Sequence, residues 1–141
     1  MKQAKWAVAA MLAVFSGLAV GQRIGSSTIV AEVPFQFVAA NRVVPAGECK
    51  VQAETMDGKT LIIRNVEARK SLFASISETE SKQAAANYTL VFARYGDQYF
   101  LTGIKLAGSH IEYRLPESRL EHELRAQNVS ATEETVLAGL E

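Results

Sequence analysis

The sequence is poor in the side chains that most often carry chemistry. Its 141 residues include one cysteine, one tryptophan and two histidines. A single cysteine excludes an internal disulfide framework, because each bridge needs a pair. A zinc site needs three or four ligands, and His122-Glu123 lacks the second histidine four residues later that a helical zinc motif requires. The sequence therefore predicts no metal site, and it indicates no cofactor.

An excess of charge of one sign is also missing. The chain carries 15 basic and 15 acidic residues, so its formal net charge at pH 7 is zero. Proteins that bind nucleic acid or an anionic membrane surface present a basic stripe or patch. The balanced composition therefore predicts no nucleic-acid partner and gives no reason to expect binding to a membrane surface.

Residues 1–21 differ in kind from the rest of the chain. They begin with two lysines and no acid, and residues 6–20 are apolar or small. This run is shorter than the roughly 20 residues of a membrane span, and Ala19 and Gly21 are small residues at the positions that a signal peptidase reads. We predict a signal peptide cleaved between Gly21 and Gln22, with an uncleaved anchor as the alternative. Cleavage gives a periplasmic or secreted protein with no integral membrane span in its mature chain.

The mature chain has about 120 residues, which is enough for one hydrophobic core. Residues 22–28 are polar and rich in glycine and serine, which indicates a flexible N-terminus. From residue 29, apolar side chains recur with the period of two that is typical of strands. We predict one mainly β domain over residues 29–127, built as a small antiparallel β-barrel or sandwich of about 7–8 strands.

Proline and glycine punctuate the first strands. Residues 33–38 alternate, but Pro34 cannot donate to a ladder, so this strand is expected at a sheet edge or with a bulge. Pro45 and Gly47 occupy the second and fourth positions of a type I turn. This turn leads into a strand predicted over residues 48–54.

Alternation also predicts how the next strands pair. A three-residue loop with a left-handed Gly58 pairs Ala53 with Leu61 and Val51 with Ile63, which keeps one apolar face intact. Residues 70–77 form another alternating strand, with Leu72, Ala74 and Ile76 on its apolar face. Residues 78–87 are expected to be a polar linker without strand character.

Residues 87–104 contain the clearest hairpin signal. Gly96-Asp97 suits a two-residue turn with glycine first, which pairs Arg94 with Tyr99 and Phe92 with Leu101. Both faces are apolar near the middle, so we expect the strand pair to be covered on both sides. The predicted faces are Leu90, Phe92 and Leu101 on one side and Val91, Ala93, Phe100 and Ile104 on the other.

The pattern changes after a last alternating strand over residues 110–115. Pro116 suits a first helical turn, and Leu120 and Leu124 lie one turn apart, so we predict a C-terminal helix over residues 116–127 packed on the sheet. Residues 128–141 contain a capping-box pattern, which predicts a short helix or otherwise a disordered tail.

Several segments together resemble a group of small secreted proteins of Gram-negative soil bacteria whose activity is uncharacterised. They are "VPFQF" at 33–37, "VPAGECKV" at 44–51, "LIIRN" at 61–65, "RYGDQYFL" at 94–101 and "LPESRLEHEL" at 115–124. The resemblance implies export and a compact β domain, and it supplies no activity. Cys49 departs from the aromatic residue of that pattern, so no redox role follows from the resemblance.

The candidate binding residues crowd around the predicted hairpin turn. They are Arg94, Tyr95, Asp97 and Tyr99, and Arg94 and Tyr99 are placed for a cation–π contact worth about 0.5–1 kcal/mol. These tyrosines equally fit half-buried strand positions, because strands favour aromatic residues. Cys49 is predicted to be a buried free thiol, since no histidine is placed to activate it.

No catalytic set is apparent. The chain has no Gly-x-Ser-x-Gly motif, and Glu121 and Glu123 are two residues apart on the predicted helix, so they point away from each other. We therefore predict a non-enzymatic binding or envelope-associated structural module, with a protein or another envelope component as its partner. One alternative is a carrier of a small apolar ligand inside the barrel. Another is a small hydrolase that uses His110 or His122.

Overall fold

The computed structural model describes residues 28–53 and 59–141. The predicted signal peptide, its cleavage site, most of the polar segment 22–28 and the turn at Gly58 lie outside the described residues. Within them the chain is mainly β, with twelve strands and one short helix. No helix in this part of the chain is long and apolar enough to cross a membrane.

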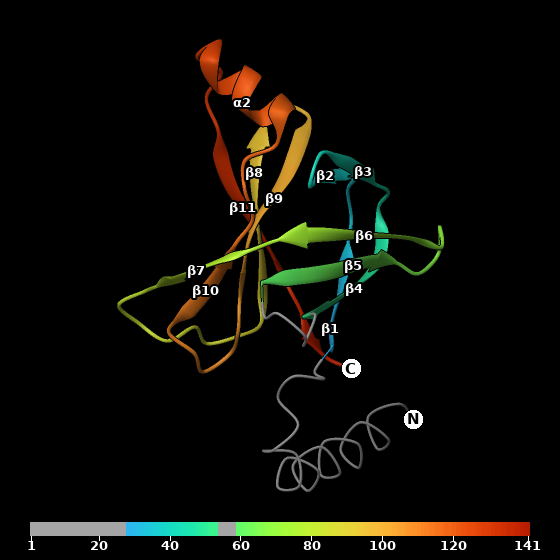
Figure 1. Ribbon diagram of the computed structural model, residues 1–141, viewed down its shortest axis with the longest axis vertical. Coiled ribbons are helices and arrows are strands. Elements are labelled where there is room, and N and C mark those ends of the chain that lie inside the picture. The colour runs from blue at the N-terminus through green and yellow to red at the C-terminus, as the bar shows by residue number, and fades with distance from the viewer. Residues whose placement is uncertain (1–27, 54–58) are drawn as a thin grey trace, which may run out of the picture.

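The strands form two sheets, which Figure 1 shows crossing at an angle. The first sheet, sheet A, has five strands in the order β12-β1-β4-β5-β6. The second, sheet B, has β11-β8-β9-β10-β7, and β9 also pairs with β2, which pairs with β3. The bounds in sheet A are β1 Thr28–Val33, β4 Gly47–Ala53, β5 Thr60–Asn65, β6 Lys70–Ser75 and β12 Gly139–Leu140. Those in sheet B are β2 Phe37–Ala39, β3 Arg42–Val44, β7 Ser77–Glu80, β8 Thr89–Tyr95, β9 Gln98–Lys105, β10 Ile111–Arg114 and β11 Thr132–Leu137.

The prediction of a mainly β fold is confirmed, and the two sheets make it sandwich-like. The barrel alternative is wrong, because the sheets do not close into one cylinder. The expected 7–8 strands are too few. The excess arises because the chain changes sheets within runs that look continuous: only Ile76 separates β6 from β7, and only Ala138 separates β11 from β12.

Pro34 marks a third change of sheet. It was expected inside one strand, but β1 ends at Val33 in sheet A and β2 begins at Phe37 in sheet B. Because proline cannot supply the next ladder bond, the strand ends there and the chain turns the corner. Both Val33 and Phe37 remain buried, so the alternation reports burial correctly although it spans two strands.

Two further predictions are wrong because the strands concerned depend on pairing partners that are distant in the sequence. Residues 78–87 were expected to have no strand character, but β7 pairs along its whole length with β10. Residues 128–141 were expected to form a helix or a frayed tail, but β11 pairs with six residues of β8 and β12 pairs with β1. Polar strands such as these are specified by a partner distant in sequence, and local composition does not reveal that partner.

The registers predicted for the hairpins are confirmed. Val51 lies opposite Ile63, and Arg94 lies opposite Tyr99. A bulge between Val91 and Phe92 then shifts the ladder, so Ile104 lies opposite Leu90 in the main core and not on the predicted opposite face. Both faces of this hairpin are covered, as predicted. The largest fully buried side chains between the sheets include Phe37, Phe92, Ile63, Leu90 and Ile104.

The helix α2 spans Arg119–Ala126, within the predicted range. Figure 1 shows it at the end of sheet B, near the tip of the β8–β9 hairpin. Its buried residue is Glu121, whereas Leu120, expected to face the sheet, is exposed. The Asn41 side chain from the β2–β3 turn accepts a hydrogen bond from the Arg119 amide at 2.7 Å, which caps a free N–H at the start of the helix.

Candidate functional site

The hairpin tip that carries the four predicted binding residues is a tight turn. Gly96 has φ +65° and Asp97 has no positive φ, which fits a two-residue turn of type II′ with glycine first. The four residues do not converge on one site. Arg94 and Tyr99 form one cluster, Tyr95 is buried on the other side of the strand, and Asp97 is exposed in the turn.

The Arg94–Tyr99 cluster braces the hairpin. The Arg94 guanidinium lies 5.5 Å from the centre of the Tyr99 ring, and its Nε donates to the Gly96 carbonyl at 2.8 Å. Phe35 stacks on Tyr99 with ring centres 3.8 Å apart. Since Phe35 already covers one face of the Tyr99 ring and Arg94 lies over the same ring, Tyr99 does not offer a free stacking platform. The predicted cation–π pair is present, and its contacts are structural.

Tyr95 connects the hairpin to α2. Its hydroxyl donates a hydrogen bond to the Glu121 carboxylate at 3.0 Å, and both residues are buried. Burial, followed by this hydrogen bond, raises the pKa of Tyr95 to about 12. Burial also raises the pKa of Glu121 above its usual value, although the hydrogen bond from Tyr95 acts in the opposite direction. The helix is therefore held against the sheet by a buried carboxyl group whose charged form is disfavoured.

This pair predicts a specific pH dependence. A raised pKa in the folded state means that the native protein holds the Glu121 proton more tightly than the unfolded chain does, so stability falls as pH rises above about 4.5. Glu121→Gln is expected to remove this loss, so its free energy of unfolding relative to wild type should be greater at pH 7.5 than at pH 4. Urea unfolding of both proteins at pH 4 and at pH 7.5 measures these free energies. Glu123→Gln, at an exposed position of the same helix, is the control and should show no such difference.

Cys49 is a buried free thiol, as predicted. Burial in the core of sheet A, with contributions from Glu32, Glu48 and Glu67, raises the pKa of its thiol to about 11. A thiol with this pKa is almost entirely protonated at neutral pH, and the thiolate is the reactive form. Cys49 therefore acts as a core side chain.

The two histidines are surface residues. The His110 ring interacts with the Ser81 carbonyl, and the His122 ring lies 3.1 Å from the Glu117 carboxylate, which also pairs with Arg125. Within residues 28–53 and 59–141, no cluster of three or more histidine, cysteine or acidic side chains could hold a metal ion. The surroundings of both histidines are those of ordinary surface contacts.

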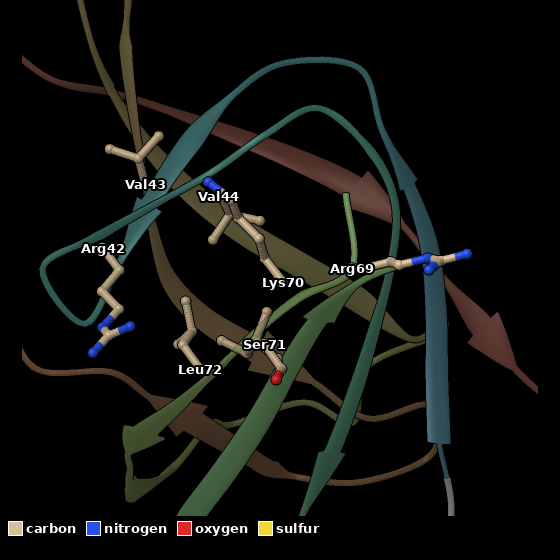
Figure 2. Close-up of a pocket in the computed structure, with 8 residues that line it drawn as sticks. Arg42, Val43, Val44, Arg69, Lys70, Ser71 and Leu72 are labelled. Carbon is tan, nitrogen blue, oxygen red and sulfur yellow. The ribbon is translucent and has the colours of Figure 1, made fainter. Parts of the chain in front are cut away.

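The most distinctive surface feature is a groove of about 710 Å³ between β3 and β6, which we call the β3–β6 groove. It is lined by residues 42–44 of β3, Ile63 of β5, Arg69 of the turn before β6 and residues 70–72 of β6. Its walls combine apolar side chains with Arg42, Arg69 and Lys70. Figure 2 shows Arg42 and Lys70 on the groove side and Arg69 directed away from it.

The cations of this groove lack acidic partners. Across the described ranges, the side chains of Arg42, Arg69 and Lys70 form no ion pair, although Lys50, Arg94, Arg114 and Arg125 each have one. Unpaired cations beside apolar surface can bind an anionic group without first breaking an internal contact. The groove therefore has the features of a binding site for an acidic partner.

Asn65 holds the two turns that flank the groove. Its side-chain amide donates to the Pro45 carbonyl at 2.8 Å, and its oxygen accepts from the Ala68 amide at 2.7 Å. The first turn follows β3 and the second precedes β6. Gly47 follows the first turn with φ +135°, a backbone conformation that residues with a Cβ atom rarely adopt, so this position favours glycine. This explains the "PAG" segment structurally.

The sequence did not reveal this groove. Arg42 is separated from Arg69 and Lys70 by 27 and 28 positions, and each looks like an ordinary surface cation at a turn. The β2–β3 hairpin had a signal in Asn41, a residue type that tolerates positive φ. Ala40 and Asn41 have φ 52° and 64°, the pattern of a type I′ turn.

No protein-family model, no curated protein and no solved structure shows a significant match to this chain.

Proposed function

We propose that this protein is an exported, non-catalytic binding module that holds an acidic envelope component in the β3–β6 groove. The observation that carries the proposal is the presence, beside the apolar side chains of one groove, of cations that have no acidic partner within the described part of the chain. The chain as a whole is neutral, so this attraction is local and does not depend on an overall basic surface.

The groove is a better candidate than the hairpin tip or the protein interior. Arg94 and Tyr99 are engaged with Gly96 and Phe35, so a ligand would have to displace existing contacts. Large side chains such as Phe37 and Phe92 fill the space between the sheets, which disfavours the carrier of an apolar ligand. A ligand can enter the surface groove without displacing the contacts of Arg94 and Tyr99 and without moving the side chains that fill the interior.

Charge reversal tests the proposal. We expect poly-L-glutamate, polygalacturonate or both to bind the purified protein, and Arg42→Glu/Lys70→Glu to weaken binding at least tenfold. Isothermal titration calorimetry at low and physiological salt measures the affinity, which should fall as salt screens the charges. The two polymers carry the same carboxylate on a polypeptide and on a polysaccharide, so they distinguish the two sources.

A second double variant controls for net charge. Lys82→Glu/Lys105→Glu changes the charge equally, at a smaller groove of about 410 Å³ lined by both lysines. This variant should bind within twofold of wild type. The proposal is wrong if neither polymer binds, or if the two double variants weaken binding to the same degree.

A further inference from the structure

The β3–β6 groove lies beside a free strand edge. Among the strands of residues 28–53 and 59–141, β6 is the last strand of sheet A and pairs only with β5, while β3 pairs only with β2. Antiparallel pairs alternate between residues that exchange backbone hydrogen bonds and residues whose N–H and C=O groups face away from the partner strand. This alternation determines which backbone N–H and C=O groups of β6 face away from β5.

The Ile76 amide fixes the alternation on β6. It donates to the Lys59 carbonyl at 2.8 Å, and these two residues continue the uninterrupted β5–β6 register. Because the alternation has a period of two, the backbone groups of Ala74, Leu72 and Lys70 also point toward β5. The remaining residues, Ser71, Phe73 and Ser75, therefore direct their N–H and C=O groups away from the sheet.

A second hydrogen bond gives the same alternation independently. The Val66 amide donates to the Glu48 carbonyl at 3.0 Å, in the register of the β4–β5 pair. Even-numbered residues of β5 therefore bond to β4 and odd-numbered residues bond to β6. Leu61 and Ile63 accordingly face Ala74 and Leu72, in agreement with the first assignment.

The side chains at this edge suit an additional strand. Leu72 is buried in the groove floor with Val44 and Ile63, whereas Phe73 on the outer face is 62% exposed. Lys70 has the same alternation as Leu72, and Figure 2 shows it on the groove side. A strand added to β6 would place alternate side chains toward the apolar floor, and one end of it would lie near Lys70 and Arg42.

We infer that the partner is a polypeptide, and that an extended acidic segment of it adds as a strand to the free edge of β6. This inference rests on the proposed function of the groove. Main-chain hydrogen bonds to Ser71, Phe73 and Ser75 provide attachment, apolar side chains fill the floor, and carboxylates reach Arg42 and Lys70. Pairing along residues 71–75 corresponds to a segment of about 17 Å at about 3.4 Å per residue.

The charge at the groove also protects the edge. An exposed, unpaired edge invites pairing with another copy of the same chain, and charged residues are a common safeguard against it. Arg69 and Lys70 stand before and at the start of β6, and β6 itself contains no acidic residue, so a second copy aligned along this edge would offer these cations no partner from its own β6. An acidic segment supplies that partner, which favours the hetero-partner.

A pair of modified peptides tests main-chain pairing. The probe is a capped heptapeptide, Glu-Ser-Val-Ser-Val-Ser-Glu, in which the valines and the terminal glutamates share one face, so the valines can face the groove floor while a carboxylate faces Lys70 and Arg42. One version carries N-methyl groups on the two valines and the other on the first two serines, so each removes two N–H groups from one edge of the extended peptide. We expect the parent to bind, and one methylated version to lose at least tenfold more affinity than the other, because only one edge faces β6.

A variant of the protein provides the complementary test. Ser71→Pro removes an N–H that faces away from β5, so the fold is expected to persist by circular dichroism, since proline is tolerated at such edge positions. Heptapeptide affinity should fall at least tenfold, and amide exchange at Phe73 should no longer slow when peptide is added.

The two proposals fail in different ways. Equal affinities for the two methylated peptides would overturn strand addition, while dependence on Arg42 and Lys70 would leave the acidic groove standing. Binding of the parent peptide that is unaffected by Arg42→Glu/Lys70→Glu would overturn the groove itself. Binding of polygalacturonate alone, without the peptide, would assign the groove to a polysaccharide and overturn the inference.

Discussion

Glu134→Pro is expected to destabilise the protein by about 2 kcal/mol or more, whereas Glu133→Pro, one residue earlier, is expected to cost much less. The reason is the direction of the two amides in β11. The Ala138 amide donates to the Tyr88 carbonyl at 2.9 Å in the β11–β8 register, so residues 136, 134 and 132 direct their backbone groups toward β8. Glu134 therefore loses a ladder bond to Phe92, while the Glu133 N–H faces away from β8.

The comparison is matched in residue type, in substitution and in loss of charge. Glu134 also forms a 3.7 Å ion pair with Arg94 between two exposed side chains, which contributes little, and Glu134→Ala measures that contribution separately. Urea unfolding gives the free energies, and size-exclusion chromatography detects association through the exposed β8 edge. Equal stabilities of the two proline variants would show that β11 is not an integral part of sheet B.

The predictions that succeeded depend on patterns that are complete within a short stretch of chain. Gly96-Asp97 lies between two alternating strands, so turn chemistry and burial together fix the pairing of Arg94 with Tyr99. The register of Val51 with Ile63 follows because only that alignment keeps the apolar side chains on one face. In both hairpins the local information is sufficient.

The predictions that failed require knowledge of a distant partner. The alternation of residues 70–77 continues through Ile76 without interruption, although the chain leaves sheet A there. The segment that forms β11 resembles a capping box, and only its pairing with β8 makes it a strand. A period of two reports which side chains are buried, and it does not report which sheet buries them.

The candidate site was missed for a related reason. Arg42 and Lys70 come together only because β2 and β3 form a hairpin that folds back beside the edge of β6. Arg94 and Tyr99 are conspicuous in the sequence because a tight hairpin needs bracing contacts at its tip. Crowded functional groups in one stretch can indicate local structure, while the groove is assembled from separate segments.

Asn65→Ala is expected to cost about 2 kcal/mol of stability, because it removes a buried side chain and leaves the Ala68 amide and the Pro45 carbonyl without their partner. Asn65 is 1% exposed, so water does not readily replace its amide. Asn87→Ala, at an exposed position, is the control and should be nearly neutral. Urea unfolding of both variants makes the comparison.

Asn65→Asp sharpens this prediction and relates it to the groove. Aspartate keeps an oxygen for the Ala68 amide but places a second oxygen against the Pro45 carbonyl, so this variant should be least stable at neutral pH and recover as the carboxyl group is protonated in acid. Because Asn65 joins the turn after β3 to the turn before β6, its loss should also weaken binding of poly-L-glutamate under conditions where the variant is still folded. Unchanged affinity in a folded Asn65→Ala protein would contradict this account, since the groove would then not need its two walls held together.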